Sequence, residues 1–181
     1  MITFKRIEND SDPLWGKMYD LYESAFPAVE RRDATALKNV MKSENKFQVS
    51  ALLKENCFVG FFNDWHFEDF VYVEHFAVCP ELRGKLIGTE VVSLYLKKKR
   101  LPIVFEVEKP ENEVAKRRIA LSERLGCHLL PYDYAQPHYD GSGKLFPMLL
   151  MTNDSAFVSQ NVRRIKSSIY EEVYHYNDNN T

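Results

Sequence analysis

Three strand-like runs follow one another between residues 47 and 78, and they restrict the fold more than any other feature of the chain. The runs read FQVSALL, CFVGFF and DFVYVEHFAV, and only short segments separate them. Consecutive strands with short connections pair as antiparallel hairpins. This part of the chain therefore predicts an antiparallel meander.

Helical patterns stand on both sides of this meander. Asp12 can cap a first helix that has Pro13 at its first position and stops at Pro27. Further helices are expected over 33–41, 87–99 and 111–125, and further strands over 2–7, 101–107, 127–134 and 145–152. This order predicts an α/β fold, in which a mixed, mostly antiparallel central sheet of about seven strands carries helices on both faces.

The end of the chain carries a separate amphipathic pattern. Apolar residues recur there at spacings of four, three, four and four, which predicts an extra C-terminal helix with one buried face. They are Val158, Val162, Ile165, Ile169 and Val173. We expect one domain over 1–152, this helix over 153–176 and a frayed tail over 177–181. The helix either packs on its own domain or forms a contact in a homodimer.

The composition limits the class of function. A chain of 181 residues suits one domain, and a net charge of -2 gives no basic surplus for binding nucleic acid. Cys57, Cys79 and Cys127 are too scattered for a disulfide framework or a metal-ligand pair, so we expect reduced thiols and no metal. The chain shows neither an apolar run that could span a membrane nor a signal peptide. A cytoplasmic protein without nucleic-acid or membrane partners is expected, and the basic run KKKR is interpreted as a solvated helix end.

The stretch PELRGKLIGTEVV, residues 80–92, brings glycine and positive charge together between a strand and a helix. Gly84 and Gly88 let the backbone approach a ligand because they carry no Cβ, and Arg83 and Lys85 add two cations. A helix N-terminus offers unpaired N–H groups and a partial positive charge to an anion. The stretch therefore predicts a phosphate or pyrophosphate site, although it contains neither GxxxxGK[ST] nor GxGxxG.

The string RGKLIG within this stretch resembles the acyl-CoA loop of the GCN5-related N-acetyltransferases (the GNAT superfamily), whose pattern is [QR]xxGx[GA]. Leu86 replaces the inner glycine, so the backbone approach to the pyrophosphate is expected to be longer or rearranged there. The order of elements over 2–152 resembles the same superfamily. The resemblance implies that the fourth and fifth strands splay apart around the pantetheine arm of acetyl-CoA, the expected co-substrate. It also implies that the coenzyme contacts the backbone of Phe76, Ala77, Val78, Arg83, Gly84, Lys85, Leu86, Ile87, Gly88 and Thr89.

A second landmark of the superfamily is a helix of the type NxxAxxxYxxxGF, which NEVAKRRIALSERLGC resembles in part. Asn112 and Ala115 have the right mutual spacing, which implies that Asn112 contacts the cofactor. Asn112 lies 14 residues before Gly126, however, where the family has 11, so either the helix is a turn longer or Ala115 takes the asparagine's place. Ser122 stands where the family has the tyrosine that protonates the leaving thiolate. Its hydroxyl is a poor acid, and Tyr139 is a candidate replacement.

Acetyl transfer to an amine requires a base for the amine proton. Glu74 is the first candidate, because a glutamate among apolar strand neighbours is partly desolvated and its pKa is then raised. Glu106 and Glu108 share one face of the next strand and are rival bases or anchors for the amine. His75 alternates to the face opposite Glu74, where a packed histidine is expected rather than a second base.

The resemblance places the acceptor over the first two helices and the last hairpin. The nominated residues are Glu30, Arg31, Arg32, Tyr134, Gln136 and Tyr139. The acidic candidates are Glu30, Glu74, Glu106 and Glu108, and they favour a cationic small molecule or an amine terminus as the acceptor. We predict an acetyl-CoA-dependent N-acetyltransferase with direct transfer, because no cysteine has a base partner. The alternative is a CoA-binding regulatory or pseudoenzyme module, which the departures at Leu86 and Ser122 would explain.

Overall fold

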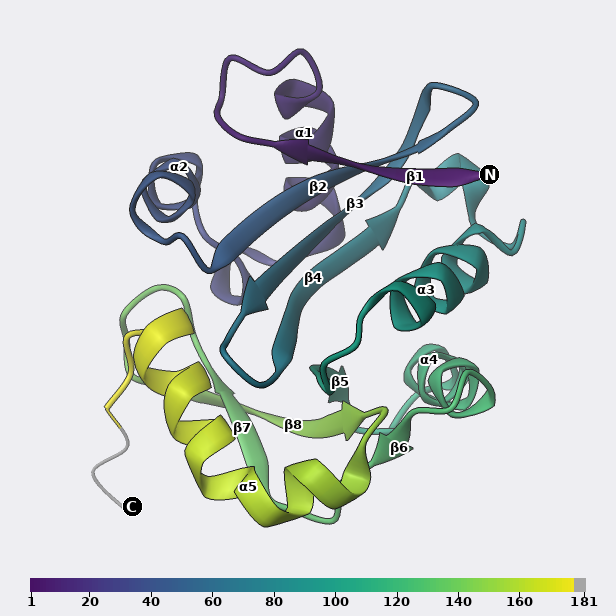
Figure 1. The fold of residues 1–181 in the computed structure, drawn as a ribbon. Coiled ribbons are helices and arrows are strands. Elements are labelled where there is room, and N and C mark those ends of the chain that lie inside the picture. Colours follow the sequence, from purple (N-terminus) through teal and green to yellow (C-terminus); the bar gives the residue numbers. More distant parts are fainter. Residues whose placement is uncertain (178–181) are drawn as a thin grey trace.

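The computed structural model describes residues 1–177, and its centre is one mixed sheet of eight strands (Figure 1). The order is β1-β2-β3-β4-β5-β8-β6, and β7 also pairs with β8. The strands are β1 (Ile2–Ile7), β2 (Phe47–Lys54), β3 (Cys57–His66), β4 (Val71–Val78), β5 (Ile103–Glu108), β6 (His128–Leu129), β7 (Tyr134–Pro137) and β8 (Leu145–Thr152). The expected α/β fold with a mostly antiparallel sheet is therefore confirmed, with one strand more than expected.

The antiparallel meander predicted for residues 47–78 is present. Strands β2, β3 and β4 pair in sequence order, and β1 pairs with the outer edge of β2. Gly60 on β3 is required for this pairing, since a Cβ there would lie 2.3 Å from the carbonyl oxygen of Ala77 on β4. The missing side chain thus allows two backbones to approach closely at the end of β4.

The contact between β4 and β5 is parallel and short. It extends only from the pair Val71–Ile103 to the pair Val73–Phe105, although β4 continues to Val78. The sheet therefore consists of two halves, β1–β4 and β5–β8, which are joined by three residue pairs and then part. Figure 1 shows the two halves diverging, with β1–β4 above and β7 and β8 below.

The segment 127–134 was expected to form one strand, and this expectation was wrong. Only His128 and Leu129 form β6, and the chain pairs with β8 again from Tyr134, where β7 begins. Pro131 lies between the two strands, and a proline has no N–H to donate to a sheet. This interruption explains the additional strand.

Helices cover both faces of the sheet, as expected. They are α1 (Trp15–Ala25), α2 (Ala34–Ser43), α3 (Ile87–Lys98), α4 (Glu113–Arg124) and α5 (Ser155–Ser168), with short 3-10 turns η1 (Ala28–Glu30) and η2 (Pro80–Leu82). The buried residues of α1, α2 and α5 belong to the main apolar cluster. Those of α3 form a second cluster and Ile119 of α4 a third, and these two clusters share Leu96 and Phe105.

Side-chain caps fix several helix starts. Asp33, Asn112 and Asp154 each accept a hydrogen bond from the backbone N–H three residues further on, at 2.8, 2.9 and 3.0 Å. Asp12 does not cap a helix that begins at Pro13. It accepts from Leu14 N at 2.8 Å in a preceding turn, and α1 begins only at Trp15.

The C-terminal helix packs on its own chain. Val158 and Ile165 of α5 are fully buried in the main cluster, together with Ile169 and Val173 of the π-helical turn η3 (Ile169–Val173). The predicted apolar face is therefore buried against the sheet. Of the predicted frayed tail, residues 178–181 lie outside the described residues.

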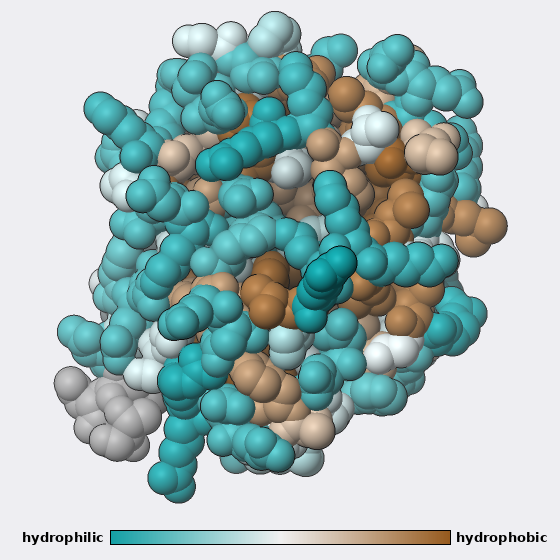
Figure 2. Space-filling model, viewed as in Figure 1, coloured by the Kyte–Doolittle hydropathy of each residue, from teal (hydrophilic) through white to brown (hydrophobic). Residues whose placement is uncertain are grey.

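Figure 2 shows hydrophobic surface in patches that hydrophilic side chains interrupt. Within residues 1–177, every helix is too short or too polar to cross a membrane.

Candidate active site

The two strands that part from each other carry a carboxylate at the same point. Val73 and Phe105 are the last paired residues of β4 and β5, and Glu74 and Glu106 follow them directly. Glu74 is also the extra residue of a β-bulge, because Asn63 and Asp64 of β3 pair with His75 and Val73 and leave Glu74 unpaired. Bulges redirect side chains, and they are common next to active sites.

The glycine loop, which we define as residues 83–89, leads from η2, which follows β4, into the first turn of α3. Gly84 has φ +77°, and Leu86 has φ +61° and ψ +5°, the left-handed conformation that glycine adopts easily. Leu86 is also 75% exposed. Leu86 therefore adopts a backbone conformation that glycine favours, and its side chain is exposed to solvent.

Not every amide of this loop is available to a ligand. Arg83 N donates to Pro80 O at 3.2 Å, and Lys85 N donates to Leu82 O at 3.3 Å. Ile87 and Gly88 begin α3, whose first N–H groups have no acceptor within the helix. A Cβ at Gly88 would meet only Phe76 and Val78 side chains, at 3.9 and 4.0 Å. The N–H groups that α3 leaves without an acceptor within the helix therefore lie in the second half of the loop.

Glu74 is held in a buried ion pair. Its side chain is 0% exposed, and its Oε1 accepts a hydrogen bond from Arg32 Nη1. Tyr139 Oη donates to the same oxygen at 2.5 Å, and Trp65 Nε1 donates to Oε2 at 3.0 Å. Burial raises the pKa of Glu74, but Arg32, then His75 and the hydrogen bonds outweigh it, so the pKa is lowered. The expectation of a raised pKa was wrong, because the sequence did not reveal the cation.

His75 points to the same face as Glu74, not to the opposite one, because the bulge breaks the alternation of the strand. Its ring packs edge-on against Tyr22 and Phe26, and its Nε2 lies 2.9 Å from the carbonyl oxygen of Glu30. Burial lowers the pKa of His75, which keeps the ring neutral. The prediction of a packed histidine therefore agrees with the geometry.

Within the described residues, every hydrogen-bond donor to Glu106 is a tyrosine hydroxyl. Tyr134 Oη donates to its Oε1, and Tyr174 Oη lies 3.0 Å from both carboxylate oxygens. Tyr72 Oη lies 2.9 Å from Tyr174 Oη. Burial raises the pKa of Glu106 to about 7, and the hydrogen bonds from the tyrosines only partly oppose this rise. Glu106, not Glu74, is thus the carboxylate whose pKa suits a general base at neutral pH.

Glu74 and Glu106 belong to one buried network, which we call the carboxylate cluster. It consists of Arg32, Trp65, Tyr72, Glu74, Glu106, Tyr134, Tyr139 and Tyr174. The rings of Tyr139 and Tyr174 lie 5.0 Å apart and connect its two halves. The cluster faces α1, α2 and the C-terminal segment, on the side of the sheet away from α3 and α4.

Four candidates for the acceptor site remain, and they lie on or next to η1 (Glu30, Arg31), on β5 (Glu108) and on β7 (Gln136). Glu30 is half-buried, and burial together with the charge of Glu108 raises its pKa. Glu108 itself is partly exposed and pairs with Arg118 at 2.8 Å. Arg31 donates to Phe26 O at 3.1 Å, and Gln136 is buried on β7. The loop between β7 and β8 contacts η1 directly, since the backbone N–H of Tyr139 donates to the carbonyl of Val29 at 3.0 Å.

Two candidates on α4 have local partners instead. The Asn112 side chain caps α4 by accepting from Ala115 N at 2.9 Å, so the spacing of these two residues has a structural cause. Ser122 Oγ donates to Arg118 O at 3.1 Å. Within residues 1–177 neither side chain forms a hydrogen bond with the carboxylate cluster, whereas the other predicted acid, Tyr139, does.

The sequence analysis missed Trp65, Tyr72 and Tyr174, and it assigned no ion pair to Arg32. Tyr72 precedes Glu74 by two residues on β4, so the period of a strand could have pointed to it. Tyr174 lies 68 residues from Glu106 along the chain. No local pattern connects them, which is why the contact became visible only in the fold.

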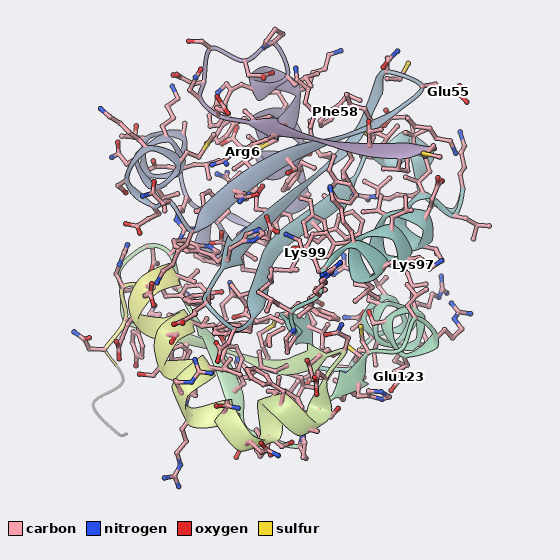
Figure 3. All side chains as sticks on the ribbon, viewed as in Figure 1. Arg6, Glu55, Phe58, Lys97, Lys99 and Glu123 are labelled. Atoms are coloured by element: carbon pink, nitrogen blue, oxygen red, sulfur yellow. The ribbon has the colours of Figure 1, made fainter. Side chains whose placement is uncertain are left out.

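A third buried carboxylate lies on the other face of the sheet. Asp64 accepts from Tyr95 Oη, and its Oδ2 lies 2.9 Å from His66 Nε2 and 3.5 Å from Lys99 Nζ. Lys97 and Lys99 lie at the C-terminal end of α3 (Figure 3). The interpretation of KKKR as a solvated helix end is therefore wrong for Lys99, which is only 21% exposed. Among the described residues, no group of three or more His, Cys, Asp or Glu side chains could hold a metal ion.

Comparison with known proteins agrees with this geometry. The sequence profile described as "Acetyltransferase (GNAT) family" matches residues 15–126. A solved structure described as an acetyltransferase from the GNAT family of Bacteroides thetaiotaomicron has 31% identity and a TM-score of 0.92, and the match covers 97% of this chain and 99% of that one. No curated protein matches the sequence.

More distant structures share the fold. An acetyltransferase of Bacillus subtilis in complex with CoA has a TM-score of 0.54 and 15% identity, over 84% of this chain and 97% of that one. A GNAT family acetyltransferase of Elizabethkingia anophelis with acetyl-CoA bound has a TM-score of 0.56 and 15% identity, over 83% and 96%. Since the family profile spans more than half of the chain and a 31% identical structure spans nearly all of it, the chain belongs to the GNAT family of acetyltransferases.

Proposed function

We propose that the protein transfers an acetyl group from acetyl-CoA directly to an amine of a small-molecule acceptor, with Glu106 as the general base. The observation that supports this most is the position of Glu106. It directly follows the last pair between β4 and β5, where the strands part, and its pKa is raised to about 7. At neutral pH a carboxylate with this pKa is partly ionised, and it is basic enough to take the proton from the acceptor amine.

The proposed reaction removes two protons from the acceptor nitrogen and includes one displacement. The acceptor ammonium gives its first proton to the Glu106 carboxylate, and the neutral amine then attacks the thioester carbonyl carbon. The carbon–sulfur bond breaks, coenzyme A leaves as a thiolate, and this thiolate takes the second proton from the nitrogen, so that the products are the acetylated amine and CoA thiol. Direct transfer is favoured because burial raises the pKa of Cys79 and raises that of Cys127 to about 11, which leaves both thiols protonated.

The gap between β4 and β5 and the glycine loop suit the donor. From Glu74 onward the edge of β4 that faces β5 has no strand partner, so its backbone groups can pair with an extended pantetheine arm. Arg83 and Lys85 supply positive charge beside the start of α3 for the pyrophosphate. The structures of relatives with CoA or acetyl-CoA bound support this assignment.

The acceptor side is acidic and aromatic, which favours a cationic amine. The charge of Glu108 contributes to the raised pKa of Glu30, and tyrosine hydroxyls surround Glu106. Aromatic faces and carboxylates both attract cations. Three free cysteines suit a reducing compartment, and we therefore place the activity in the cytoplasm.

The alternative is a module that binds CoA without efficient catalysis. Ser122 favours it, because its hydroxyl is engaged with Arg118 O and cannot replace the tyrosine of the family in protonating the thiolate. A thiolate is a good leaving group near neutral pH, so this loss need not stop the reaction. The two functions differ in turnover rather than in coenzyme binding.

The test measures release of CoA thiol from acetyl-CoA in the presence of a panel of primary amines and polyamines, with mass spectrometry of the product. Glu106→Gln should lower kcat by about 10²–10⁴-fold and leave the Kd of CoA unchanged. Glu55→Gln, at an exposed carboxylate in the turn between β2 and β3, is the control and should retain activity. Binding of CoA without acetylation of any amine would support the alternative module instead.

A further inference from the structure

The C-terminal segment lies outside the part of the chain that matches the family profile, yet it reaches the carboxylate cluster. The profile ends at residue 126, and α5 begins at Ser155. From this segment, Tyr174 Oη lies 3.0 Å from both oxygens of Glu106. We propose that the C-terminal segment completes the active site by supplying Tyr174 as a positioning residue, which sets the protonation and orientation of Glu106. This inference deepens the proposed function and rests on it.

The π-helical turn places Tyr174 at this point. Tyr174 N donates to Ile169 O at 3.3 Å, a bond across five residues that defines a π-helix rather than an α-helix. The wider turn brings residues four apart onto one side, so that Ile169 and Val173 stay buried while Tyr170 and Tyr174 also face the sheet. In a regular α-helix, which has fewer residues per turn, Tyr174 would point in a different direction relative to the sheet. π-helical turns occur frequently at functional sites.

Independent contacts hold the segment in place. Arg32 Nη2 donates to the carbonyl of Val173 at 2.6 Å, while Nη1 of the same side chain binds Glu74. Tyr170 Oη donates to the carbonyl of Ala135 on β7 at 2.5 Å. The residue next to Tyr174 is therefore fixed by the same cation that fixes Glu74. This connects the C-terminal segment to both carboxylates of the cluster.

The directions of the hydrogen bonds follow from the chemistry of the groups. An ionised carboxylate only accepts, so Tyr134 and Tyr174 both donate their hydroxyl protons to Glu106. Tyr174 then has no proton left for Tyr72, and Tyr72 must donate to Tyr174 at 2.9 Å. The chain of donors runs from Tyr72 through Tyr174 to Glu106. Removal of the Tyr174 hydroxyl should destabilise the ionised form of Glu106 and so raise its pKa.

The experiment follows the ionisation of Glu106 by carbon-13 NMR of the glutamate carboxyl groups in the free protein, with its signal identified by its loss in Glu106→Gln. Tyr174→Phe should raise the midpoint by about one pH unit, because a hydrogen bond to a charged group favours the ionised form. Tyr176→Phe is the control, since that ring packs on Tyr170 and lies two residues beyond Tyr174. Its midpoint should equal that of the parent.

A second variant protects the test if Tyr174→Phe folds poorly. Tyr72→Phe removes the donor to Tyr174 and should raise the midpoint in the same direction by less. A Glu106 midpoint in both variants equal to that of the parent would overturn the proposal. The pH dependence of kcat/KM, measured with an acetylated amine, should move with the NMR midpoint in Tyr174→Phe.

These two readouts separate the inference from the proposed function. If the NMR midpoint moves and the pH profile does not, Tyr174 controls Glu106, but Glu106 is not the base, and the proposed mechanism fails. If neither moves, the positioning role of Tyr174 fails even where the protein acetylates amines. A shift of both, absent in Tyr176→Phe, supports the proposal.

Discussion

The glycine loop and the carboxylate cluster both carry charged side chains, but those of the loop are exposed and those of the cluster are buried. The glycine loop is exposed, and Leu86 at its centre is 75% exposed in a left-handed conformation. The carboxylate cluster is buried, and every carboxylate oxygen in it has a hydrogen-bond donor. The charged side chains of the loop therefore contribute little to stability and are accessible to a ligand. In the cluster, the free energy of unfolding depends on the protonation of Glu74 and Glu106.

The difference also shows how each region obtains its chemistry. The loop uses backbone N–H groups and consecutive residues, so its properties depend on short-range spacing. The side chains of the cluster come from four strands (β3, β4, β5 and β7), from the loop between β7 and β8, from the segment between η1 and α2, and from the C-terminal segment. Changes in the cluster should affect folding and pH dependence, and changes in the loop should affect mainly coenzyme binding.

The largest effect should come from Arg32→Met. This change leaves the buried Glu74 carboxylate without its cation, and it should lower the free energy of unfolding by about 3–5 kcal/mol at neutral pH. Arg32 holds the pKa of Glu74 below its ordinary 4.5, so the ion pair contributes stability above that pH and loses it as the pH falls through the folded pKa. Urea unfolding at pH 7 and pH 4 should therefore show a smaller deficit at pH 4.

The control for this comparison is Arg164→Met. Arg164 lies 2.6 Å from Asp69, and the two side chains are 47% and 43% exposed, so its loss should cost less than about 1 kcal/mol. Equal deficits for the two arginine variants would contradict the assignment of the buried pair as the stabilising contact.

Glu106→Gln should change how stability depends on pH. The folded pKa of Glu106 is raised from 4.5 to about 7, so the native state binds the proton more tightly than the unfolded chain. The parent should lose roughly 3 kcal/mol as the pH rises from about 4.5 to above 7, and Glu106→Gln should lose less over that range. Thermal unfolding across this range measures the difference, and parallel curves for the two proteins would show that Glu106 titrates normally.

The double variant Arg83→Ala, Lys85→Ala should affect binding without affecting the fold. Loss of two exposed cations should weaken CoA by roughly 5–30-fold at low salt and change the free energy of unfolding by less than about 0.5 kcal/mol. Calorimetric titration with acetyl-CoA measures the first, and urea unfolding the second. Lys97→Ala, Lys98→Ala at the opposite end of α3 should bind like the parent. Equal weakening by both pairs would show that the effect is overall charge rather than the loop.

The smallest effect is expected at Leu86. Leu86→Gly should relieve the left-handed strain, but glycine loses more entropy on folding, which leaves a net stabilisation of about 0.5 kcal/mol or less. Leu86→Val places a β-branched side chain at the same φ and should destabilise by about 1 kcal/mol. Thermal unfolding should rank the proteins Gly, Leu, Val, and any other order would indicate that the backbone changes conformation.

The sequence predicted the elements and the glycine loop because both depend on local patterns. Strand alternation gave the meander, Asp33 was expected at the start of the second helix, and Gly126 ends α4 in the left-handed conformation with φ +88°. The error at 127–134 came from Pro131, which divides a run of otherwise strand-like residues. These features act over a few residues, which is the range that a single sequence can report.

The carboxylate cluster could be predicted only in part, because partners far apart in the chain decide its chemistry. Glu74 and Glu106 were found as carboxylates on adjacent strands. Their pKa values diverge because Arg32 lies beside one and only tyrosines beside the other. The bulge that turns His75 onto the face of Glu74 depends on the register with Asn63. None of these facts has a local sequence signal.

The short pairing between β4 and β5 has a mechanical consequence. Two half-sheets that share three residue pairs can open by fraying at that seam, so amide hydrogens from Val71 to Val73 should exchange faster than those in the middle of β3. A molecule that lies in the gap and bonds to β4 would lengthen the seam and slow this opening. The rigidity of the whole sheet would then depend on whether the gap between β4 and β5 is occupied.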